Sequence, residues 1–147
     1  IEKLWPIYGD KSFADGDIRK LNHTGTHPVH TDLAIMNAID FHESIGISRK
    51  EARLRHLQNY WTRQVRGHSR IRLNTPTDPR RSCAIANVGI EGIAPRDLAK
   101  TLLEKHRIWT VGIQTANVHG VRITPHLFTT TAELDTFVGA LKMIATG

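Results

Sequence analysis

The chain has 147 residues, of which 39% are hydrophobic and 23% charged, and its 20 basic and 14 acidic residues give a formal net charge of +6. From this length we expect one domain, which can bury about 68–70% of the surface that the unfolded chain exposes. No apolar run approaches the ~20 residues of a membrane span, and a single cysteine, Cys83, cannot form an internal disulfide. We therefore expect a globular protein without a membrane partner, and nothing calls for an oxidising compartment, which favours the cytoplasm.

Residues 1–27 are interpreted as a connecting segment. Turn-forming combinations such as Tyr8-Gly9-Asp10 and Ala14-Asp15-Gly16-Asp17 leave no sustained periodicity in it. It starts at Ile1 with neither the basic start nor the long apolar core of a signal peptide. We expect that more chain precedes it in the natural protein.

Two helices are expected next. The first runs from about Pro28 to Ile45, because its apolar residues keep helical spacing, a proline suits the first turn, and Gly46 lies just past the end. The second starts with the capping-box pattern Ser48-Arg49-Lys50-Glu51, carries an apolar stripe at three- and four-residue intervals, and should end near Gly67.

The remainder of the chain alternates short strands with helices. Strands are expected at Ile71–Asn74, Ala84–Ile90, Ile108–Ile113 and Val121–Thr124, and helices from Pro95 to His106 and after the capping box Thr130-Thr131-Ala132-Glu133. This alternation predicts an α/β (α+β) fold, with a layer of three or four strands and helices packed against it. The pattern does not give the strand order.

The strand Val121–Thr124 carries the first candidate site. Apolar and polar residues alternate in it, so that Val121 and Ile123 face a core while Arg122 faces away, and Pro125 ends the strand. An arginine on an open sheet face is either a solvated charge or a planar fork for an anion such as a carboxylate. On chemistry alone, the solvated charge is the simpler interpretation.

The second candidate site is the stretch Gly25-Thr26-His27-Pro28. A helix start offers unpaired N–H groups and a positive dipole end, which suit a phosphate, and Thr26 adds a hydroxyl donor. The alternative is that Thr26 or His27 simply caps the helix. We expect no metal here, because Gly25 and Pro28 interrupt the helix that would be needed to bring His23 and His27 to one face.

Much of the positive charge lies between Arg49 and Arg81, a range that contains nine arginines. Such a cluster admits nucleic acid or an acidic partner. No zinc-finger spacing, RNA-recognition motif or helix-turn-helix pattern accompanies it. We interpret it as a solvated helix face, or as one that docks on an acidic surface of another part of the protein, and expect no nucleic-acid partner.

The stretch Gly-Val-Arg-Ile-Thr-Pro-His-Leu-Phe-Thr-Thr at residues 120–130, followed by an acidic residue and a regular apolar helix, resembles the end of class V pyridoxal-phosphate (PLP) enzymes. The branch it most resembles is that of isopenicillin-N-epimerase-like proteins, and Gly25-Thr26 matches a Gly-Thr pair of the family. By this resemblance Arg122 binds the α-carboxylate of an amino-acid substrate. Gly25, Thr26 and His27 bind the cofactor, with Thr26 reaching the PLP phosphate of the neighbouring subunit in a homodimer.

The resemblance implies that residues 28–147 are the small C-terminal domain of a fold-type I PLP enzyme, with a mainly antiparallel sheet. Residues 1–27 then continue from a large PLP domain that this chain lacks. No lysine matches the family's cofactor-binding lysine motif, so the chain alone is expected to be inactive, and Cys83 does not match the loop cysteine of the similar cysteine desulfurases. The longer enzyme is expected to be an epimerase, lyase or transaminase. The alternative is a free-standing basic module that binds protein or nucleic acid.

Overall fold

The computed structural model describes residues 1–6, 11–22 and 28–147. The chain forms two compact units, Ile1–Phe41 and His42–Gly147. No helix in the described ranges is long and apolar enough to cross a membrane. The expected division into a segment of residues 1–27 and a domain of residues 28–147 stays a prediction.

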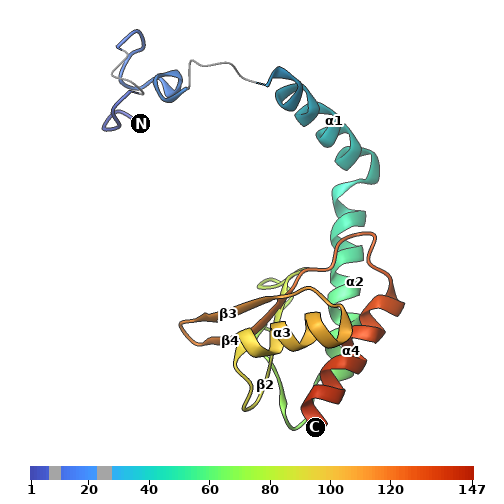
Figure 1. The fold of residues 1–147 in the computed structure, drawn as a ribbon. Coiled ribbons are helices and arrows are strands. Elements are labelled where there is room, and N and C mark those ends of the chain that lie inside the picture. Colours follow the sequence, from blue (N-terminus) through green and yellow to red (C-terminus); the bar gives the residue numbers. More distant parts are fainter. Residues whose placement is uncertain (7–10, 23–27) are drawn as a thin grey trace. The chain divides into compact units, whose positions relative to one another are not determined.

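Turns and helix make up the described part of the first unit. A short 3-10 helix, η2 (Ile18–Leu21), starts after Asp17, whose carboxylate accepts the backbone N–H of Arg19 at 2.9 Å. Helix α1 (Val29–Ile45; Figure 1) follows, with its residues 42–45 counted to the second unit, and confirms the helix expected after Pro28. No residue of α1 is buried. The apolar residues of α1 thus have helical spacing in the sequence, but their side chains are exposed in this structure.

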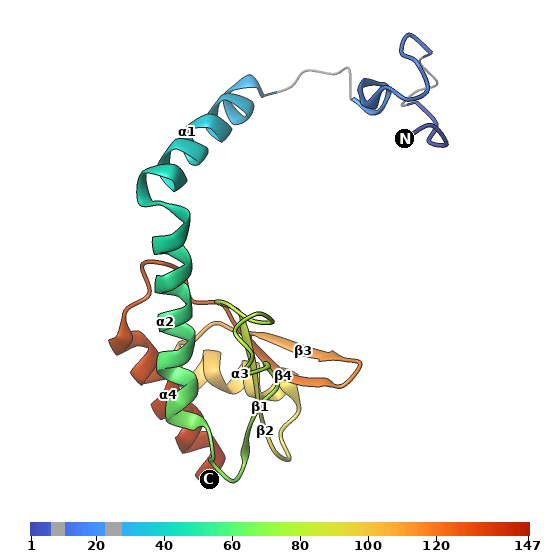
Figure 2. The ribbon, with the colours of Figure 1, turned by 180° about the vertical axis from the view of Figure 1, so that it is seen from behind.

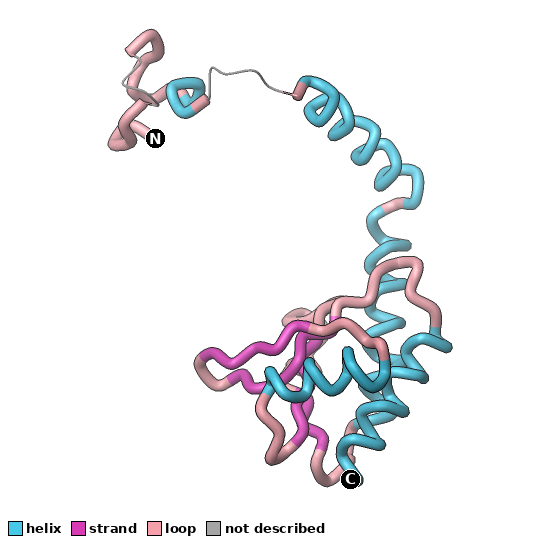
Figure 3. Tube along the Cα trace, in the orientation of Figure 1, coloured by secondary structure: helices cyan, strands magenta, loops and turns pink. Residues whose placement is uncertain are grey.

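The second unit contains a four-stranded sheet (Figure 3). Its strands are β1 (Ile71–Leu73), β2 (Ala86–Ile90), β3 (Val111–Thr115) and β4 (Val118–Ile123). They lie in the order β1-β2-β4-β3, and every neighbouring pair is antiparallel. The expected fold class, a small mixed α/β layer with a mainly antiparallel sheet, is confirmed.

Three helices complete the second unit: α2 (Ile47–Val65), α3 (Pro95–His106) and α4 (Thr131–Thr146). Helices α3 and α4 contact the sheet, while α2 and α4 run side by side (Figures 1 and 2). The apolar stripes of the helices meet the inward face of the strands in one core, where the Trp61 ring meets the edge of Phe137 at 5.3 Å between centroids. The periodicity of the sequence therefore predicted the buried faces of α2, α3 and α4 correctly.

The two expected capping boxes have different outcomes. The one before α4 is confirmed, since the Thr130 hydroxyl accepts the Glu133 N–H at 3.2 Å and the Glu133 carboxylate accepts the Thr130 N–H at 2.7 Å. The one at Ser48 is wrong. Helix α2 already starts at Ile47, directly after Gly46, whose positive φ of 88° makes the turn into the helix and leaves Ser48 inside the first turn.

The strand boundaries also differ from the expectation: β1 ends at Leu73, β3 ends at Thr115, and β4 runs from Val118 to Ile123. Strand β3 starts at Val111 and not at Ile108, because the Ile108 N–H bonds to the Leu102 carbonyl oxygen and closes the end of α3. Strand β2 starts at Ala86, since the carbonyl oxygen of Ile85 accepts the Gln58 side chain at 3.1 Å. Cys83 consequently lies outside the strand in a bend and is partly exposed, although the apolar run Cys83-Ala84-Ile85-Ala86 suggests a buried thiol.

Arginines of the basic cluster hold loop carbonyl groups. Arg55 donates from Nη1 to the carbonyl oxygens of Pro79 at 2.7 Å and Ser82 at 2.6 Å. Arg70 donates from Nη1 to the carbonyl oxygen of Ala145 at the end of α4, at 2.8 Å. A planar guanidinium with several donors suits such multiple contacts. These members of the cluster therefore serve the fold, which is a role that the sequence did not indicate.

Candidate functional site

Arg122 lies on β4, in the middle of the sheet. Its register partner on one side is Asn87 of β2, and on the other side it is Val111 of β3. Val121 and Ile123 are buried, whereas Arg122 is exposed on the face opposite to the core. The expected alternation of this strand is confirmed, and it places the guanidinium on the outer face.

The guanidinium of Arg122 has no hydrogen-bond or ion-pair partner among the residues that the structure describes. Arg72 of β1 lies on the same face of the sheet but has a partner. Its Nη2 lies 2.9 Å from Glu91 Oε1. A structural ion pair with an acid of the described chain is thus not the role of Arg122. The parallel N–H donors of its guanidinium are therefore available to bind a planar anion.

Two asparagines continue the row of Arg122 across the sheet. The Asn74 N–H bonds to the Asn87 carbonyl oxygen at 3.0 Å, and the Asn74 side-chain Nδ2 donates to Asn87 Oδ1 at 2.7 Å and to the His119 carbonyl oxygen at 3.0 Å. Asn74, Asn87 and Arg122 therefore form one polar row on the outer face. Sequence reasoning missed Asn87, although it is the one polar residue of the run Ala86–Ile90.

Gly120 leaves the space that the asparagine row needs. A Cβ atom on Gly120 would lie 2.6 Å from Asn87 Oδ1 and 2.4 Å from the Val88 carbonyl oxygen, closer than real contacts allow. The side-chain Nδ2 of Asn87 is buried and has no hydrogen-bond partner among the described residues. A buried donor without an acceptor is uncommon in folded proteins and calls for an explanation.

A small cavity of 200 Å³ lies where β4 ends. Residues of three segments line it, the loop Ile108–Thr110, the strand end Ile123–Pro125 and the start of α4. The Thr110 hydroxyl is buried there without a partner among the described residues, and Trp109 beside it is 75% exposed. Arg122 is not among the residues that line this cavity. The cavity and the arginine therefore do not form one pocket within the described chain.

The cofactor residues expected from the sequence, Gly25, Thr26 and His27, lie outside the described residues. In the chain, the described helix α1 begins two residues after His27, at Val29. His/Cys/Asp/Glu groups that could hold a metal ion are absent from the part of the chain that the structure describes, which does not include His23 or His27.

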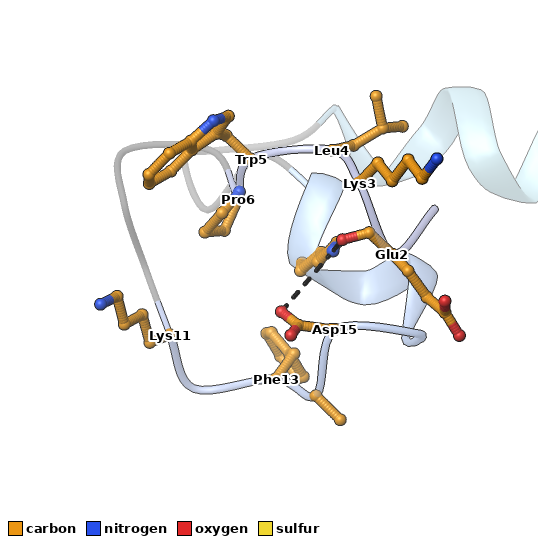
Figure 4. Close-up of a pocket in the computed structure, with 10 residues that line it drawn as sticks. Glu2, Lys3, Leu4, Trp5, Pro6, Lys11, Phe13 and Asp15 are labelled. Carbon is orange, nitrogen blue, oxygen red and sulfur yellow. Dashed lines mark hydrogen bonds and ion pairs between the residues drawn. The ribbon is translucent and has the colours of Figure 1, made fainter.

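A larger cavity of 630 Å³ lies within the first unit, and Figure 4 shows the residues around it, among them Trp5, Phe13 and Asp15. Lys20 also lines it, with a side chain that is 1% exposed. Its Nζ lies 3.4 Å from the Glu2 carbonyl oxygen and 3.9 Å from Asp15 Oδ1. Because these oxygens already engage the amine, we interpret Lys20 as a structural residue of the first unit.

Comparison with known proteins identifies the family. A family model described as "Aminotransferase class-V" matches residues 10–137, which is most of the chain and includes both Arg122 and the Gly25-Thr26 pair. The chain therefore belongs to the class-V aminotransferase family. This finding does not favour the alternative of a free-standing basic module. Among curated proteins, none matches the chain significantly.

Solved structures share the fold. A cysteine desulfurase from Thermococcus onnurineus NA1 is similar with a TM-score of 0.72, and an alanine–glyoxylate aminotransferase from Nostoc sp. with a TM-score of 0.63. Each is 18% identical, and each match covers 87% of this chain but 34% of the other chain. The chain thus spans about a third of the length of these proteins. At this identity the likeness establishes the fold alone.

Proposed function

We propose that this chain is the small-domain part of a PLP-dependent enzyme of class V that acts on an amino acid, as an epimerase, lyase or transaminase. Membership in the class-V aminotransferase family supports the enzyme class. The resemblance of residues 120–130 to isopenicillin-N-epimerase-like proteins favours that branch. The proposal includes a homodimer, in which Thr26 contacts the cofactor phosphate of the neighbouring subunit.

The observation that carries the proposal is the exposed Arg122 in the middle of the sheet, without a partner among the described residues. A substrate α-carboxylate is planar and accepts two parallel hydrogen bonds from such a fork. Binding there fixes the orientation of the substrate as well as its affinity, because a bidentate pair permits only one relative geometry. In this proposal, Arg122 is a substrate-binding residue and takes no proton.

The start of α1 supports the cofactor-phosphate contact. The first N–H groups of a helix have no partner within it, and the positive end of the dipole attracts an anion. Gly25, Thr26 and His27 precede this start in the chain, with only Pro28 between them and the helix. The donor chemistry of this stretch therefore fits a phosphate, and Thr26 would add its hydroxyl. When bound, PLP supplies an electron sink for the substrate's α-carbon, which transamination, elimination and epimerisation all require.

The test uses the PLP-loaded enzyme that contains this chain, with the variants Arg122→Ala and Arg122→Lys. Truncating one partner of a bidentate charge pair costs about 2–5 kcal/mol, so both variants should lower kcat/KM for amino acids by about 100-fold or more. Lysine should not restore the activity, because a point charge lacks the planar fork. Amine analogues without the carboxylate should lose much less activity.

Arg72→Ala is the matched control. Arg72 lies on the same face of the sheet but is paired with Glu91. Its removal should leave kcat/KM for both kinds of substrate nearly unchanged. Equal losses on amino acids and on decarboxylated amines in the Arg122 variants would assign Arg122 a structural role and remove the carboxylate contact from the proposal.

A further inference from the structure

The row Asn74, Asn87 and Arg122 contains a donor whose direction is set by its neighbours. The His119 carbonyl oxygen can only accept, so the atom of Asn74 that lies 3.0 Å from it is the side-chain NH2 group. The same NH2 group lies 2.7 Å from the Asn87 side chain, whose contacting atom must then be the oxygen. The hydrogen bonds thus assign the amide of Asn87 and leave its NH2 group directed away from Asn74.

This NH2 group is buried and has no acceptor among the described residues. The next residue in the row is Arg122, the register partner of Asn87 on β4. Side chains at directly opposite positions of an antiparallel pair have Cβ atoms about 4.5–5.5 Å apart. The two side chains thus leave the sheet next to each other on the same face, and an anion seated between them can contact both. Because Arg122 is exposed and unpaired within the described chain, its guanidinium is free to bind that anion.

We propose that Asn87 is a second substrate-binding residue, which donates a hydrogen bond from its side-chain NH2 to the carboxylate held by Arg122. This inference rests on the proposed function, since it requires the carboxylate contact of Arg122. A carboxylate has two oxygens with about four acceptor positions, and an arginine fork occupies two of them. The remaining positions are free for a neutral amide donor, and binding supplies the acceptor that the buried NH2 group lacks.

The specificity of the site follows from this pair. Arg122 contributes charge, while Asn87 contributes a donor whose direction is fixed by Asn74 and by the space above Gly120. A carboxylate matches the two parallel donors of the guanidinium with its two oxygens and keeps acceptor positions for the amide, whereas a spherical halide ion cannot form the bidentate pair. The pair should therefore bind acetate in preference to chloride at the same ionic strength.

The test is a titration of the isotope-labelled 147-residue chain with sodium acetate, followed by NMR, with sodium chloride at equal ionic strength as the reference. We expect the Arg122 Nε–H and the Asn87 side-chain NH2 signals to shift with one common dissociation constant for acetate. Asn87→Asp replaces the donor by a negatively charged oxygen and should raise that constant about tenfold or more. Asn87→Ala removes the donor without adding charge and should raise it about threefold or more.

Asn117→Asp is the control for charge, because it makes the same change at an exposed position of the turn after β3. It should leave the dissociation constant nearly unchanged. The Arg122 signal could shift with acetate while the Asn87 signal does not, with both Asn87 variants binding acetate as tightly as wild type. This result would exclude the role of Asn87 and leave the carboxylate contact of Arg122 intact. If Arg122 shows no saturable response to acetate, the carboxylate contact of the proposed function fails, and the inference about Asn87 fails with it. Should Asn87→Asp not fold, Asn87→Ala decides in its place.

Discussion

Replacing Gly120 by alanine tests whether the asparagine row depends on the space above β4. The added Cβ atom would lie 2.4 Å from the Val88 carbonyl oxygen and 2.6 Å from Asn87 Oδ1. Val88 cannot simply retreat, because it is held between the register partners Leu73 of β1 and Val121 of β4. The strands must therefore separate locally, and the Asn87 amide must leave its place as well.

The expected magnitude follows from these two contacts. Overpacking of a close-packed region costs about 1–3 kcal/mol, and a displaced amide loses a hydrogen bond worth about 1 kcal/mol. Alanine also restricts the unfolded chain, which offsets about 0.4–1 kcal/mol. We therefore expect Gly120→Ala to lower the free energy of unfolding by about 2 kcal/mol.

Urea unfolding of the purified chain measures this change as a shift of the midpoint at constant m-value. The matched control is Gly139→Ala, at an exposed position inside α4 where a Cβ atom would have no neighbour within 4 Å. Alanine is a better helix former there and should stabilise the chain by about 0.5–1 kcal/mol. A Gly120→Ala variant as stable as wild type, alongside the expected gain at Gly139, would refute the steric reasoning.

Leu102→Ala should lower the free energy of unfolding by about 2–5 kcal/mol, since Leu102 is fully buried at 0% exposure. Leu103→Ala, at the next residue of α3 with 39% exposure, should cost about half as much or less; equal losses in urea unfolding would contradict the burial of α3. The N–H and the hydroxyl of Thr130 hold the pKa of Glu133 below its ordinary value, so the ionised carboxylate stabilises α4 above about pH 4.3 and loses this effect as the pH falls through the lowered folded-state pKa. Glu133→Gln should therefore lower the urea midpoint at about pH 7, with a difference from wild type that shrinks toward about pH 3; a constant difference would exclude a role for the charge.

Local patterns in the sequence predicted most elements of the second unit. The three- and four-residue spacing of Leu57, Trp61 and Val65 indicates the buried face of α2, because helical periodicity places these residues on one side. The alternation around Arg122 indicates its exposure for the same kind of reason, since neighbouring strand residues face opposite sides. These features depend only on residues a few positions apart, which the sequence displays directly.

The turn between β3 and β4 is a feature that local patterns did not predict. Thr115 and Val118 are register partners, so that only Ala116 and Asn117 join the two strands. Ala116 has a positive φ of 47°, a conformation that such turns usually assign to glycine, asparagine or aspartate. The backbone pairing along the whole hairpin outweighs this local preference. No residue pattern therefore indicated this two-residue turn in advance.

By itself, the sequence determined which side of its strand Arg122 occupies and, through the family resemblance, which ligand to expect there. Only the tertiary structure decided that Asn87, 35 positions earlier in the chain, is its neighbour and that Asn74 orients the amide of Asn87. The physical reason is that the face of a residue follows from its own strand, whereas its cross-strand neighbours follow from the order and register of strands. Long-range pairing sets that order, and here it places β4 between β2 and β3.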